Sequence, residues 1–431
     1  MNWFIRYLPL SAHRAITMGV LHGLLRRKKS RPTYTPAPQR ILYVAASSLP
    51  YHISGYTTRT HELIRAMAAL GADMRVLTRP GYPWDRSDRL VEPESDATSF
   101  DAVQYTHMRH PSRRRLLVQY AVQAAPLIAR WAKSQRVGLI HAASNHVNAL
   151  PALLAARRLG IPFQYEMRGL WELTRASRDP GFEHSHAFSL GLALEGFVAV
   201  HADRVLVISE QLRQYAAQAW NIPADRFSLL PNCVDPCRVT PGDPHGVSPR
   251  SIGYAGSLIG YEGLDTLIEA VGILAGQGLD VRLEIIGDGE ARPELERLVE
   301  RLGLAGRVRL SGRVAPETAR SMLAGCGLVC IPRKPFTVCE IVPPIKLVEA
   351  MAMARPVIVP DLPVFRDELG AQPAGFFFTS GDAEDLARVI AQAQTDPGAL
   401  AELGDKARTY ALQRRQWRDH AAEALRPVME L

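Results

Sequence analysis

Two short apolar runs with a helix between them constrain the fold of this chain more than any other feature. Residues 327–331 and 357–359 are continuous apolar runs, as expected for strands buried on both faces of a parallel sheet. Pro343 and Pro344 open a helix between them, because proline suits a first helical turn. This order of strand, loop, helix and strand predicts an α/β fold. The start of the helix is expected at the carboxyl edge of the sheet, where such folds bind ligands.

The helix after Pro344 has a cation and an acid on one face. Lys346 and Glu349 are three residues apart, so both side chains point to the same side. Free backbone N–H groups at a helix start attract phosphate, and a carboxylate one turn further in is placed to accept hydrogen bonds from a ribose. The pattern alone fits a nucleotide site and an ordinary helix with a solvated Lys and Glu equally well.

The E-A-M-A sequence at 349–352 resembles the second half of the carboxylate motif, E-x7-E followed by A-M-A, of the retaining family 4 glycosyltransferases. These enzymes have the GT-B fold of two Rossmann-like domains. The first half of the motif departs from the family, since position 341 is Ile and the nearest acid, Glu340, comes one residue early. The P-x-K-L-x-E-A-M-A form at 344–352 is similar to a variant branch. The resemblance implies that Glu349 holds the donor ribose and that Glu340 contacts a sugar hydroxyl.

A second unit of the same kind begins the first half of the chain. The apolar run 41–45 is followed by a loop at 47–56 and a helix at 57–70, which predicts a doubly wound sheet. Gly55 lets the loop backbone approach a phosphate or sugar closely. No G-x-G-x-x-G motif is present, so nicotinamide-dinucleotide binding is poorly supported. In the related glycosyltransferases this loop has a glycine pair that faces the donor, and here only Gly55 remains.

Polar side chains follow two strands of this first half. His141 and His146 come at the end of one strand, and Glu166, Arg168 and Glu172 follow the next within the run Y-E-x-R-G-L-W-E. Charged residues after a buried strand are costly unless they are paired or functional. The run resembles a subgroup of bacterial family 4 enzymes linked to surface-polysaccharide assembly, which implies that these side chains line the acceptor half of the site. A structural histidine and a structural Arg–Glu pair are the alternatives.

The pattern restarts in the second half, whose loops are expected to hold the donor. In the commoner family pattern the loop after the strand 251–255 supplies an Arg and a Lys to the donor diphosphate, and here those places are Ser257 and Glu262. A diphosphate still needs compensating positive charge, so we expect Arg333 and Lys346 to supply it. The resemblance implies further donor contacts from four loop positions: Gly256, Ser257, Gly287 and Arg313.

Length and composition divide the chain into five expected parts. At 431 residues two domains are expected, and a Pro/Gly-rich stretch marks the link between them. We predict a basic amphipathic segment, an acceptor domain, a linker, a donor-nucleotide domain and closing helices. The last helix is expected to pack back on the first domain. These parts span residues 1–40, 41–235, 236–250, 251–400 and 401–431.

The formal net charge of +8 comes from the first segment alone. Residues 1–40 contain eight of the 51 Lys and Arg residues and no Asp or Glu, so the rest of the chain has 43 residues of each sign. A nucleic-acid-binding face is therefore not expected. The apolar residues of this segment are too interrupted, by Arg6 and Arg14, to span a bilayer. We expect residues 1–31 to form an interfacial helix on an anionic membrane surface or a disordered or core-docked extension.

The cysteine pattern indicates a reducing compartment. The chain has five cysteines, an odd number, which favours free thiols and a cytoplasmic protein, peripheral at the inner membrane face if the first segment binds lipid. Cys326 and Cys330 are four residues apart, but no paired C-x2-C or H-x3-H pattern accompanies them, so no zinc site is expected. No D-x-D motif is placed at a strand end, so no metal ion is expected.

We therefore expect a retaining glycosyltransferase that uses a nucleotide-diphosphate sugar and a glycan or lipid-linked acceptor in cell-surface polysaccharide synthesis. A UDP-sugar is favoured over a GDP-sugar by its frequency in the family, and no other cofactor is expected. Arg333, Lys346 and Glu340 are the expected catalytic residues, and the resemblance implies front-face transfer without a metal. The changed residues Ser257 and Glu262 leave a non-catalytic protein that binds sugar nucleotides or polysaccharide as the alternative.

Overall fold

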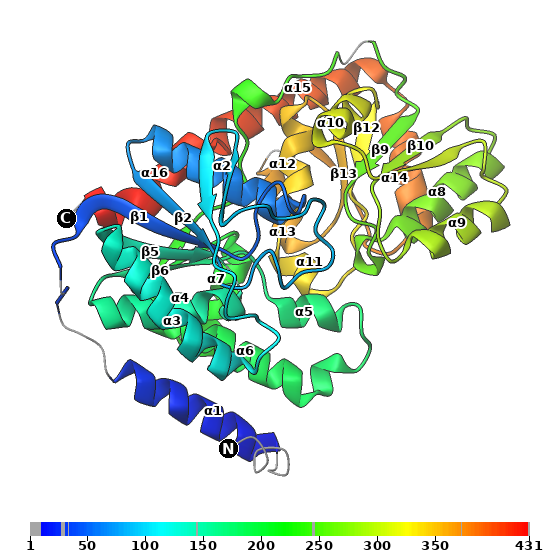
Figure 1. Cartoon of the computed structure of the whole chain (residues 1–431). Helices are drawn as coiled ribbons and strands as arrows, with labels where there is room; N and C mark the ends of the chain where they lie inside the picture. Colours follow the sequence, from blue (N-terminus) through cyan, green and yellow to red (C-terminus); the bar gives the residue numbers. More distant parts are fainter. Residues whose placement is uncertain are drawn as a thin grey trace. The chain divides into compact units, whose positions relative to one another are not determined.

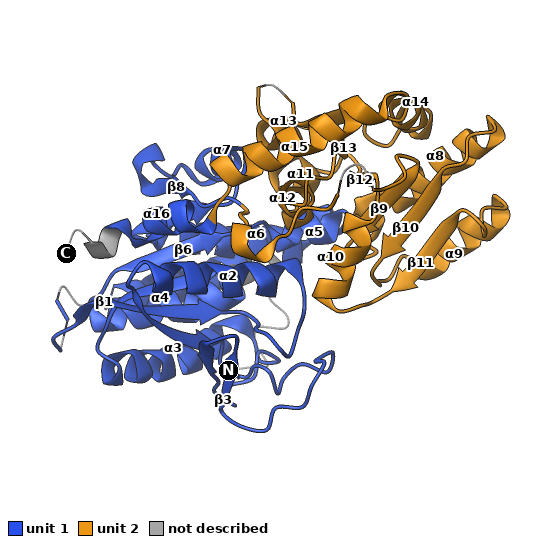
Figure 2. Cartoon of the chain, turned by 90° about the horizontal axis from the view of Figure 1, so that it is seen from above, with its two compact units in different colours: residues 1–231, 417–431 blue, residues 232–416 orange. Residues whose placement is uncertain are grey.

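The chain divides into two compact units, each built on one sheet (Figures 1 and 2). The computed structural model describes residues 10–26, 31–32, 34–143, 145–243, 246–371 and 373–429. Unit 1 comprises residues 1–231 and 417–431, and unit 2 comprises residues 232–416. Both sheets are almost entirely parallel and alternate with helices along the chain, so the expected α/β architecture of two Rossmann-like domains is confirmed.

The sheet of unit 1 has the strand order β3-β4-β2-β1-β5-β6-β7-β8, and only the β3–β4 pair is antiparallel. Strand order reverses between β1 and β5, which makes the loops after these strands the topological switch point. The strands are β1 (Ala37–Ala45), β2 (Asp73–Thr78), β3 (Ala97–Phe100), β4 (Val103–Thr106), β5 (Val137–Ala143), β6 (Phe163–Met167), β7 (Arg204–Val207) and β8 (Phe227–Leu229). The helices are α1 (Leu10–Leu25), α2 (Gly55–Ala69), α3 (Leu117–Ser134), α4 (His146–Leu159), α5 (Trp171–Ala176), α6 (His186–His201), α7 (Glu210–Trp220) and α16 (Trp417–Met429).

The sheet of unit 2 has the order β11-β10-β9-β12-β13-β14, and all of its neighbouring strands are parallel. The strands are β9 (Ser251–Ala255), β10 (Arg282–Ile286), β11 (Val308–Gly312), β12 (Leu328–Cys330), β13 (Val357–Pro360) and β14 (Gly375–Phe378). The helices are α8 (Leu264–Gly276), α9 (Arg292–Arg301), α10 (Pro316–Ala324), α11 (Thr337–Ile341), α12 (Ile345–Ala352), α13 (Pro363–Leu369), α14 (Ala383–Ala393) and α15 (Pro397–Arg414).

The apolar runs in the sequence become buried central strands, as predicted. All residues of β5 and β13 are buried, as are residues 41–45 of β1. Helix α12 follows Pro343 and Pro344 and buries its apolar side chains against the unit 2 core, which leaves Lys346 and Glu349 only partly buried. The apolar pattern therefore fixes which face of α12 is available to a ligand.

One short helix was not predicted. The segment between β12 and α12 was expected to be a loop, but residues Thr337–Ile341 form α11, in which Glu340 N donates to Phe336 O at 3.1 Å. Val338, Cys339 and Ile341 are buried. Burial of these apolar side chains stabilises a helical turn that is too short for its period to be recognised in the sequence.

The last helix of the chain belongs to unit 1. Helix α16 packs on α2, and Gln164 Nε2 on β6 donates to Ala424 O at 3.1 Å. The guanidinium of Arg59 lies over the ring of Trp417, 5.2 Å from its centroid. The end of the described chain therefore completes the core of the unit that the first strand begins.

Helix α1 is docked on unit 1 through one side. Leu21 is fully buried, and the ring of His22 lies 5.0 Å from that of Phe197 on α6. Ile16 and Val20 remain 45% exposed. Residues 1–9 and 27–30, which include most of the basic run and the first apolar group, lie outside the described residues. No helix in the described part of the chain is long and apolar enough to cross a bilayer.

Candidate functional site

Two cations of unit 2, the buried Arg333 and the partly buried Lys346, share one carboxylate. Lys346 Nζ on α12 lies 2.8 Å from Glu262 Oε2, and Arg333 Nη2, after β12, lies 3.0 Å from Glu262 Oε1. Lys346 Nζ also donates to Tyr254 Oη on β9 at 2.6 Å. We call Glu262, Arg333, Lys346 and Tyr254 the cation cradle. It joins the carboxyl end of β9, the loop after β12 and the start of α12, as the sequence predicted for Arg333 and Lys346.

The Glu262 carboxylate and its two cations stabilise one another's charged forms in a largely buried position. Burial raises the pKa of Glu262, but Arg333 and Lys346 outweigh this effect and hold it at about 2. Burial lowers the pKa of Lys346, and Arg333 adds to that shift while Glu262 opposes it. The cradle therefore holds two cations against one anion and has an excess positive charge. In addition, Arg333 Nε is buried and has no hydrogen-bond partner within the described residues.

Glycines let the surrounding loops approach closely. Gly287 has φ +139°, and a Cβ there would lie 1.8 Å from Gly256 O. A Cβ on Gly256 would lie 2.7 Å from Lys346 Nζ. Both predicted donor glycines thus bring the ends of β9 and β10 against the cradle, because any other residue would push the loops apart.

The other predicted donor residues lie at the same carboxyl edge of the sheet. Glu349 is half-buried on α12, three residues after Lys346, and Glu340 is half-buried on α11. Ser257 is exposed, and its carbonyl oxygen accepts a hydrogen bond from Tyr254 Oη at 3.0 Å. Arg313 is exposed directly after β11.

Glu262 was not predicted as a site residue. The sequence showed only that an acid stands where the family pattern has a Lys, in a loop before α8. That substitution was the available signal, because an acid placed beside two otherwise uncompensated cations is expected to pair with them.

Three of the four residues predicted for the acceptor side, Glu166, Arg168 and His141, belong to one buried network around Glu166. Its carboxylate accepts hydrogen bonds from Arg168 Nε at 2.8 Å and Arg59 Nε at 2.9 Å. Tyr43 Oη donates to it at 2.7 Å, and His141 Nε2 lies 3.1 Å away. Burial raises the pKa of Glu166, but Arg168 and Arg59 hold it well below its usual value. Glu166, Arg168 and His141 are thus engaged with one another inside the unit.

Arg59, like Tyr43, is a member of this network that the sequence did not indicate. Its Nη1 donates to Pro231 O at 2.6 Å and its Nη2 to Leu230 O at 2.5 Å. Arg168 Nη1 in turn donates to Thr60 Oγ1 at 2.7 Å. The partners are separated by more than 100 residues in the chain, so no local pattern marks them.

Glu172 lies in a second cluster at the ends of β5 and β6. His146 Nδ1 lies 3.0 Å from Glu195 Oε2 and 3.9 Å from Glu172 Oε1. Burial raises the pKa of Glu172. The pKa of His146 is raised too, because Glu195 outweighs the opposing effect of burial. A Cβ on Gly191 would lie 2.2 Å from Glu172 Oε1, so this glycine makes room for the carboxylate.

Gly55 is exposed at the start of α2, on the carboxyl side of β1. The preceding Ser54 caps the helix, accepting a hydrogen bond from Thr57 N at 3.3 Å. This cap satisfies one of the free backbone N–H groups at the start of the helix. Gly55 adds no side chain to the loop surface at that point.

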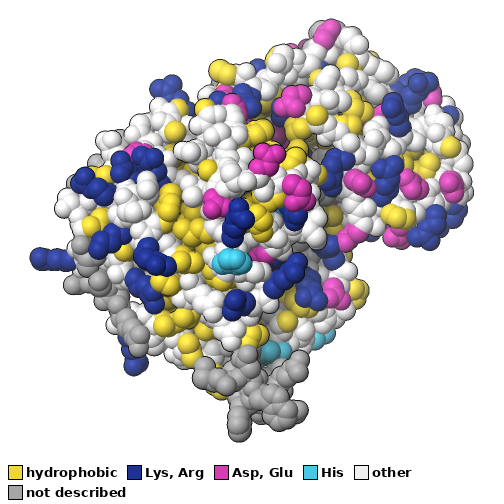
Figure 3. Space-filling view, viewed as in Figure 1, with side chains coloured by type: hydrophobic (Ala, Val, Ile, Leu, Met, Phe, Trp, Pro, Cys, Tyr) yellow, Lys and Arg dark blue, Asp and Glu magenta, His cyan; other side chains and the backbone are white. Residues whose placement is uncertain are grey.

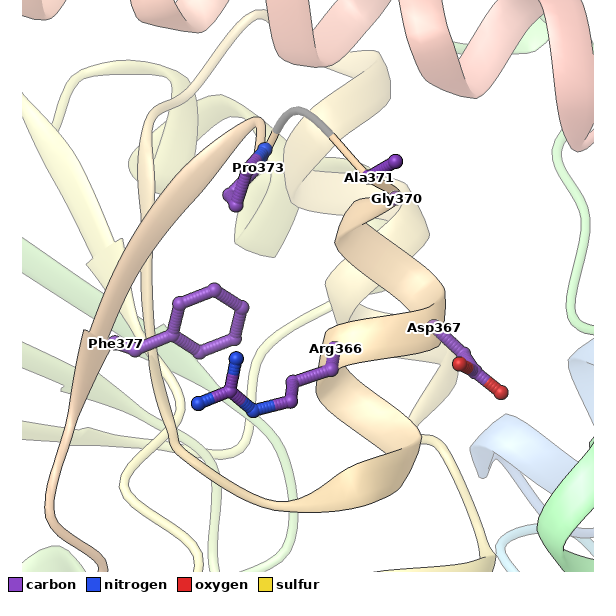
Figure 4. A pocket seen from close by; sticks show the side chains of 6 residues that line it. All are labelled: Arg366, Asp367, Gly370, Ala371, Pro373 and Phe377. Atoms are coloured by element: carbon purple, nitrogen blue, oxygen red, sulfur yellow. The ribbon is translucent and has the colours of Figure 1, made fainter.

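One further pocket lies apart from the predicted site residues. A pocket of about 460 Å³ is lined by Arg366, Phe377 and their neighbours on α13 and β14, and contains none of the predicted site residues (Figure 4). The guanidinium of Arg366 points toward the Phe377 ring, 5.3 Å from its centroid, whereas Asp367 points away. Among the described residues, no group of three or more His, Cys, Asp or Glu side chains is arranged to hold a metal ion.

Two protein families match the chain, one in each unit. Residues 54–233 match the glycosyl transferase 4-like domain, and residues 244–410 match the glycosyl transferases group 1. The chain belongs to the glycosyltransferases. The second match contains the whole cation cradle, and the first contains the network around Glu166 apart from Tyr43.

Three curated relatives show how far this similarity extends. The α-D-kanosaminyltransferase of Streptomyces kanamyceticus is 29% identical over 171 residues, which cover 37% of this chain and 43% of that one. The lipopolysaccharide core biosynthesis glycosyltransferase LpsE of Rhizobium meliloti is 29% identical over 151 residues, covering 35% and 41%. The D-inositol 3-phosphate glycosyltransferase of Streptomyces avermitilis is 22% identical over 421 residues, covering 90% and 87%. The first two matches thus span less than half of either relative.

Solved structures establish the fold of this glycosyltransferase. Sucrose-phosphate synthase from Thermosynechococcus elongatus superposes with a TM-score of 0.74 and 16% identity, covering 91% of this chain and 98% of that one. HepE from Anabaena, in complex with UDP and glucose, gives a TM-score of 0.68 and 17% identity, covering 91% and 99%. The expected GT-B fold is confirmed.

Proposed function

We propose that this glycosyltransferase moves a sugar, with retention of its anomeric configuration, from a UDP-sugar to a glycan or lipid-linked acceptor in cell-surface polysaccharide synthesis. The cation cradle is the observation on which this proposal rests. Arg333 and Lys346 meet beside the start of α12, and Glu349 follows one turn later. HepE, a structural neighbour, binds UDP and glucose, and LpsE acts in lipopolysaccharide core biosynthesis, as their names state.

The proposed roles follow from charge and position. The excess positive charge of the cradle and the N–H groups at the start of α12 stabilise the diphosphate as it leaves the sugar. Arg333 Nε is a buried donor that a phosphate oxygen can satisfy. Glu349 holds the ribose, and Glu340 or the neighbouring backbone holds a sugar hydroxyl. A donor phosphate oxygen takes the proton of the acceptor hydroxyl, so this reaction needs neither a metal ion nor a separate base.

A binding and turnover experiment on the full chain tests this function. UDP and a panel of UDP-sugars should raise the melting temperature, because a ligand that binds only the folded state stabilises it. GDP should raise it less. With a polysaccharide or lipid-linked acceptor, one UDP-sugar should release UDP. No stabilisation by any sugar nucleotide would contradict the proposal, and tight binding without turnover would favour the non-catalytic alternative.

We also propose that residues 1–31 bind an anionic membrane surface at the cytoplasmic face. On α1, Ile16 and Val20 are apolar and 45% exposed, Arg14 is exposed on the same helix, and Arg26 is exposed directly after its end. Apolar and basic side chains on one helix are typical of interfacial binding. On the face seen in Figure 3, basic side chains gather toward the lower left, whereas basic and acidic side chains are mixed toward the top and right. Unchanged co-sedimentation with anionic vesicles after deletion of residues 1–31 would contradict this proposal.

A further inference from the structure

Three loops of unit 1 form one packed assembly that the donor chemistry does not use. They follow β1, β2 and β4, at the carboxyl edge of the sheet where doubly wound folds bind ligands. Tyr82 Oη accepts a hydrogen bond from Ser48 N at 3.0 Å and lies 2.8 Å from His52 Nδ1. His52 Nε2 lies 3.2 Å from Asp88 Oδ1. These contacts join the first two loops.

A buried ion pair fixes the third loop to the second. Arg79 Nη1 and Nη2 each lie 2.7 Å from one oxygen of Asp85, and both side chains are almost fully buried. Asp85 Oδ2 also accepts a hydrogen bond from Arg113 N at 3.0 Å. Asp88 is engaged by Arg86, whose Nε lies 2.6 Å from Asp88 Oδ1. Asp85 and Asp88 are therefore already paired with other arginines.

The guanidinium of Arg113 is left without a counter-charge of its own. It is half-buried, and within the described part of the chain it has no salt bridge or side-chain hydrogen bond. Burial and the positive charges of Arg79 and Arg86 lower its pKa, while Asp85 and Asp88 oppose the shift. Arg114 and Arg115 follow it and are exposed. Arg113 is thus held through its backbone N–H beside the Arg79–Asp85 pair, while its own guanidinium has no carboxylate partner among the described residues.

We propose that Arg113 binds a phosphate group on the acceptor. A guanidinium forms two parallel hydrogen bonds with a phosphate, and a partly desolvated Arg next to like charges gains most from such an anion. The shared chemistry is a phosphate ester, supplied either by a soluble sugar phosphate or by a lipid-linked phosphate. The role as an acceptor site rests on the proposed glycosyl transfer, whereas the anion site itself does not.

Arginine labelling followed by mass spectrometry tests the site directly. The full chain is treated with a glyoxal reagent in the presence of inorganic pyrophosphate, glucose 1-phosphate or phosphatidylglycerol vesicles. Glucose is the uncharged control for glucose 1-phosphate, vesicles of zwitterionic, net-neutral phosphatidylcholine are the control for anionic phosphatidylglycerol, and exposed Arg130 on α3 is the internal control. Protection of Arg113 by glucose 1-phosphate supports a soluble phosphate, and protection by phosphatidylglycerol vesicles alone supports a lipid headgroup. No protection of Arg113 by any of the three probes overturns the proposal.

A matched pair of variants gives a second measurement. Arg113→Gln keeps the backbone contact with Asp85 and should weaken glucose 1-phosphate binding, measured by titration calorimetry, by about tenfold or more. Arg130→Gln should leave it unchanged. If Arg113→Gln does not fold, Arg113→Lys, which keeps the charge but loses the two parallel hydrogen bonds of the guanidinium, takes its place. Equal affinity in the variant and the parent protein overturns the proposal.

The thermal shift given by UDP distinguishes a failure of this anion-site proposal from a failure of the proposed glycosyl transfer. It reports on the cation cradle in unit 2 and should be the same in Arg113→Gln as in the parent protein. A parent protein that gains no stability from UDP would contradict the proposed transfer, while protection of Arg113 by phosphate would still establish the anion site.

Discussion

Glu262 Oε2 lies 2.8 Å from Lys346 Nζ, so one of the two cations proposed for the donor diphosphate is already paired with an acid of the same unit. Glu262 is buried and Lys346 is mostly buried, and the buried Arg333 is bound to the other oxygen of the same carboxylate. Breaking a buried pair leaves an uncompensated charge, which is why removal of one partner is strongly destabilising. Glu262 therefore stabilises the cradle when no diphosphate is present, and a bound diphosphate would share its cations.

The first prediction concerns removal of this acid. Glu262→Gln should lower the stability of the ligand-free protein by about 3–5 kcal/mol, because two buried cations then lack a counter-charge. UDP should restore that charge, so its thermal shift should be larger in the variant than in the parent protein. Asp265→Asn, which removes the partly exposed partner of Lys334, is the control and should change neither quantity by more than about 0.5 kcal/mol. An unchanged UDP shift in Glu262→Gln would separate Glu262 from the donor site.

The second prediction concerns acid. The folded pKa of Glu262 is about 2, below the usual 4.5, so its ionised form stabilises the folded state. This contribution, about 3 kcal/mol, is fully present above pH 4.5 and is lost as the pH falls toward about 2. Urea unfolding of the parent protein and Glu262→Gln should therefore show a stability difference that shrinks below pH 4.5. A difference that stays constant down to about pH 3 would mean that Glu262 has an ordinary pKa.

The third prediction concerns the ribose. Glu349→Ala should abolish the thermal shift given by UDP, because the carboxylate is the proposed acceptor for the ribose hydroxyls. The ligand-free melting temperature should be nearly unchanged, since Glu349 is only half-buried on α12. Glu269→Ala, an exposed residue on α8, should retain the full shift. A Glu349 variant that is fully stabilised by UDP would exclude Glu349 from the donor site.

The fourth prediction concerns the network of unit 1. Arg59→Ala removes hydrogen bonds to Glu166, Leu230 and Pro231, and leaves the Glu166 carboxylate without one of its two buried cations. Stability measured by urea unfolding should fall by about 3–5 kcal/mol. Arg213→Ala, which breaks a partly exposed pair with Glu210 on α7, should cost less than about 1 kcal/mol. Similar losses in the two variants would show that the buried network contributes no special stability.

The fifth prediction concerns the contact between two donor loops. Gly287→Ala should destabilise unit 2, because its Cβ would lie 1.8 Å from Gly256 O and its φ is +139°. The UDP shift should also fall, since the clash moves the loop away from Lys346. Gly276→Ala, at the end of α8 with no atom within 4 Å of the added Cβ, should stabilise the protein by up to about 1 kcal/mol. A Gly287→Ala protein as stable as the parent would refute the close approach.

Local patterns in the sequence predict the frame of the donor site. The prolines before α12 mark its start, and the apolar period leaves Lys346 and Glu349 on the less buried face. Parallel strands bring their carboxyl ends to one edge, so the loop after β12 and the start of α12 could be placed near each other. These features depend on a few neighbouring residues, which is why the sequence is sufficient to predict them.

Pairing across the fold could not be predicted in the same way. Glu166 and Arg168 were expected to line an acceptor site, but the partners that bury them, Arg59 and Tyr43, are distant in the chain and carry no local sign of the contact. Glu262 was visible as an unusual acid, although its two cations come from different elements. The sequence shows that a charge is present, whereas the counter-charge depends on the tertiary structure.

The place of α16 in unit 1 has a consequence for how the protein is made. Unit 2 comes from one uninterrupted segment, so a ribosome can deliver all of it before synthesis is complete. Unit 1 begins first, yet Trp417 and Ala424 cover Arg59 and Gln164 only after residues 417–431 have been translated. Unit 1, whose first strands are translated before unit 2, is thus completed only after unit 2 has been translated.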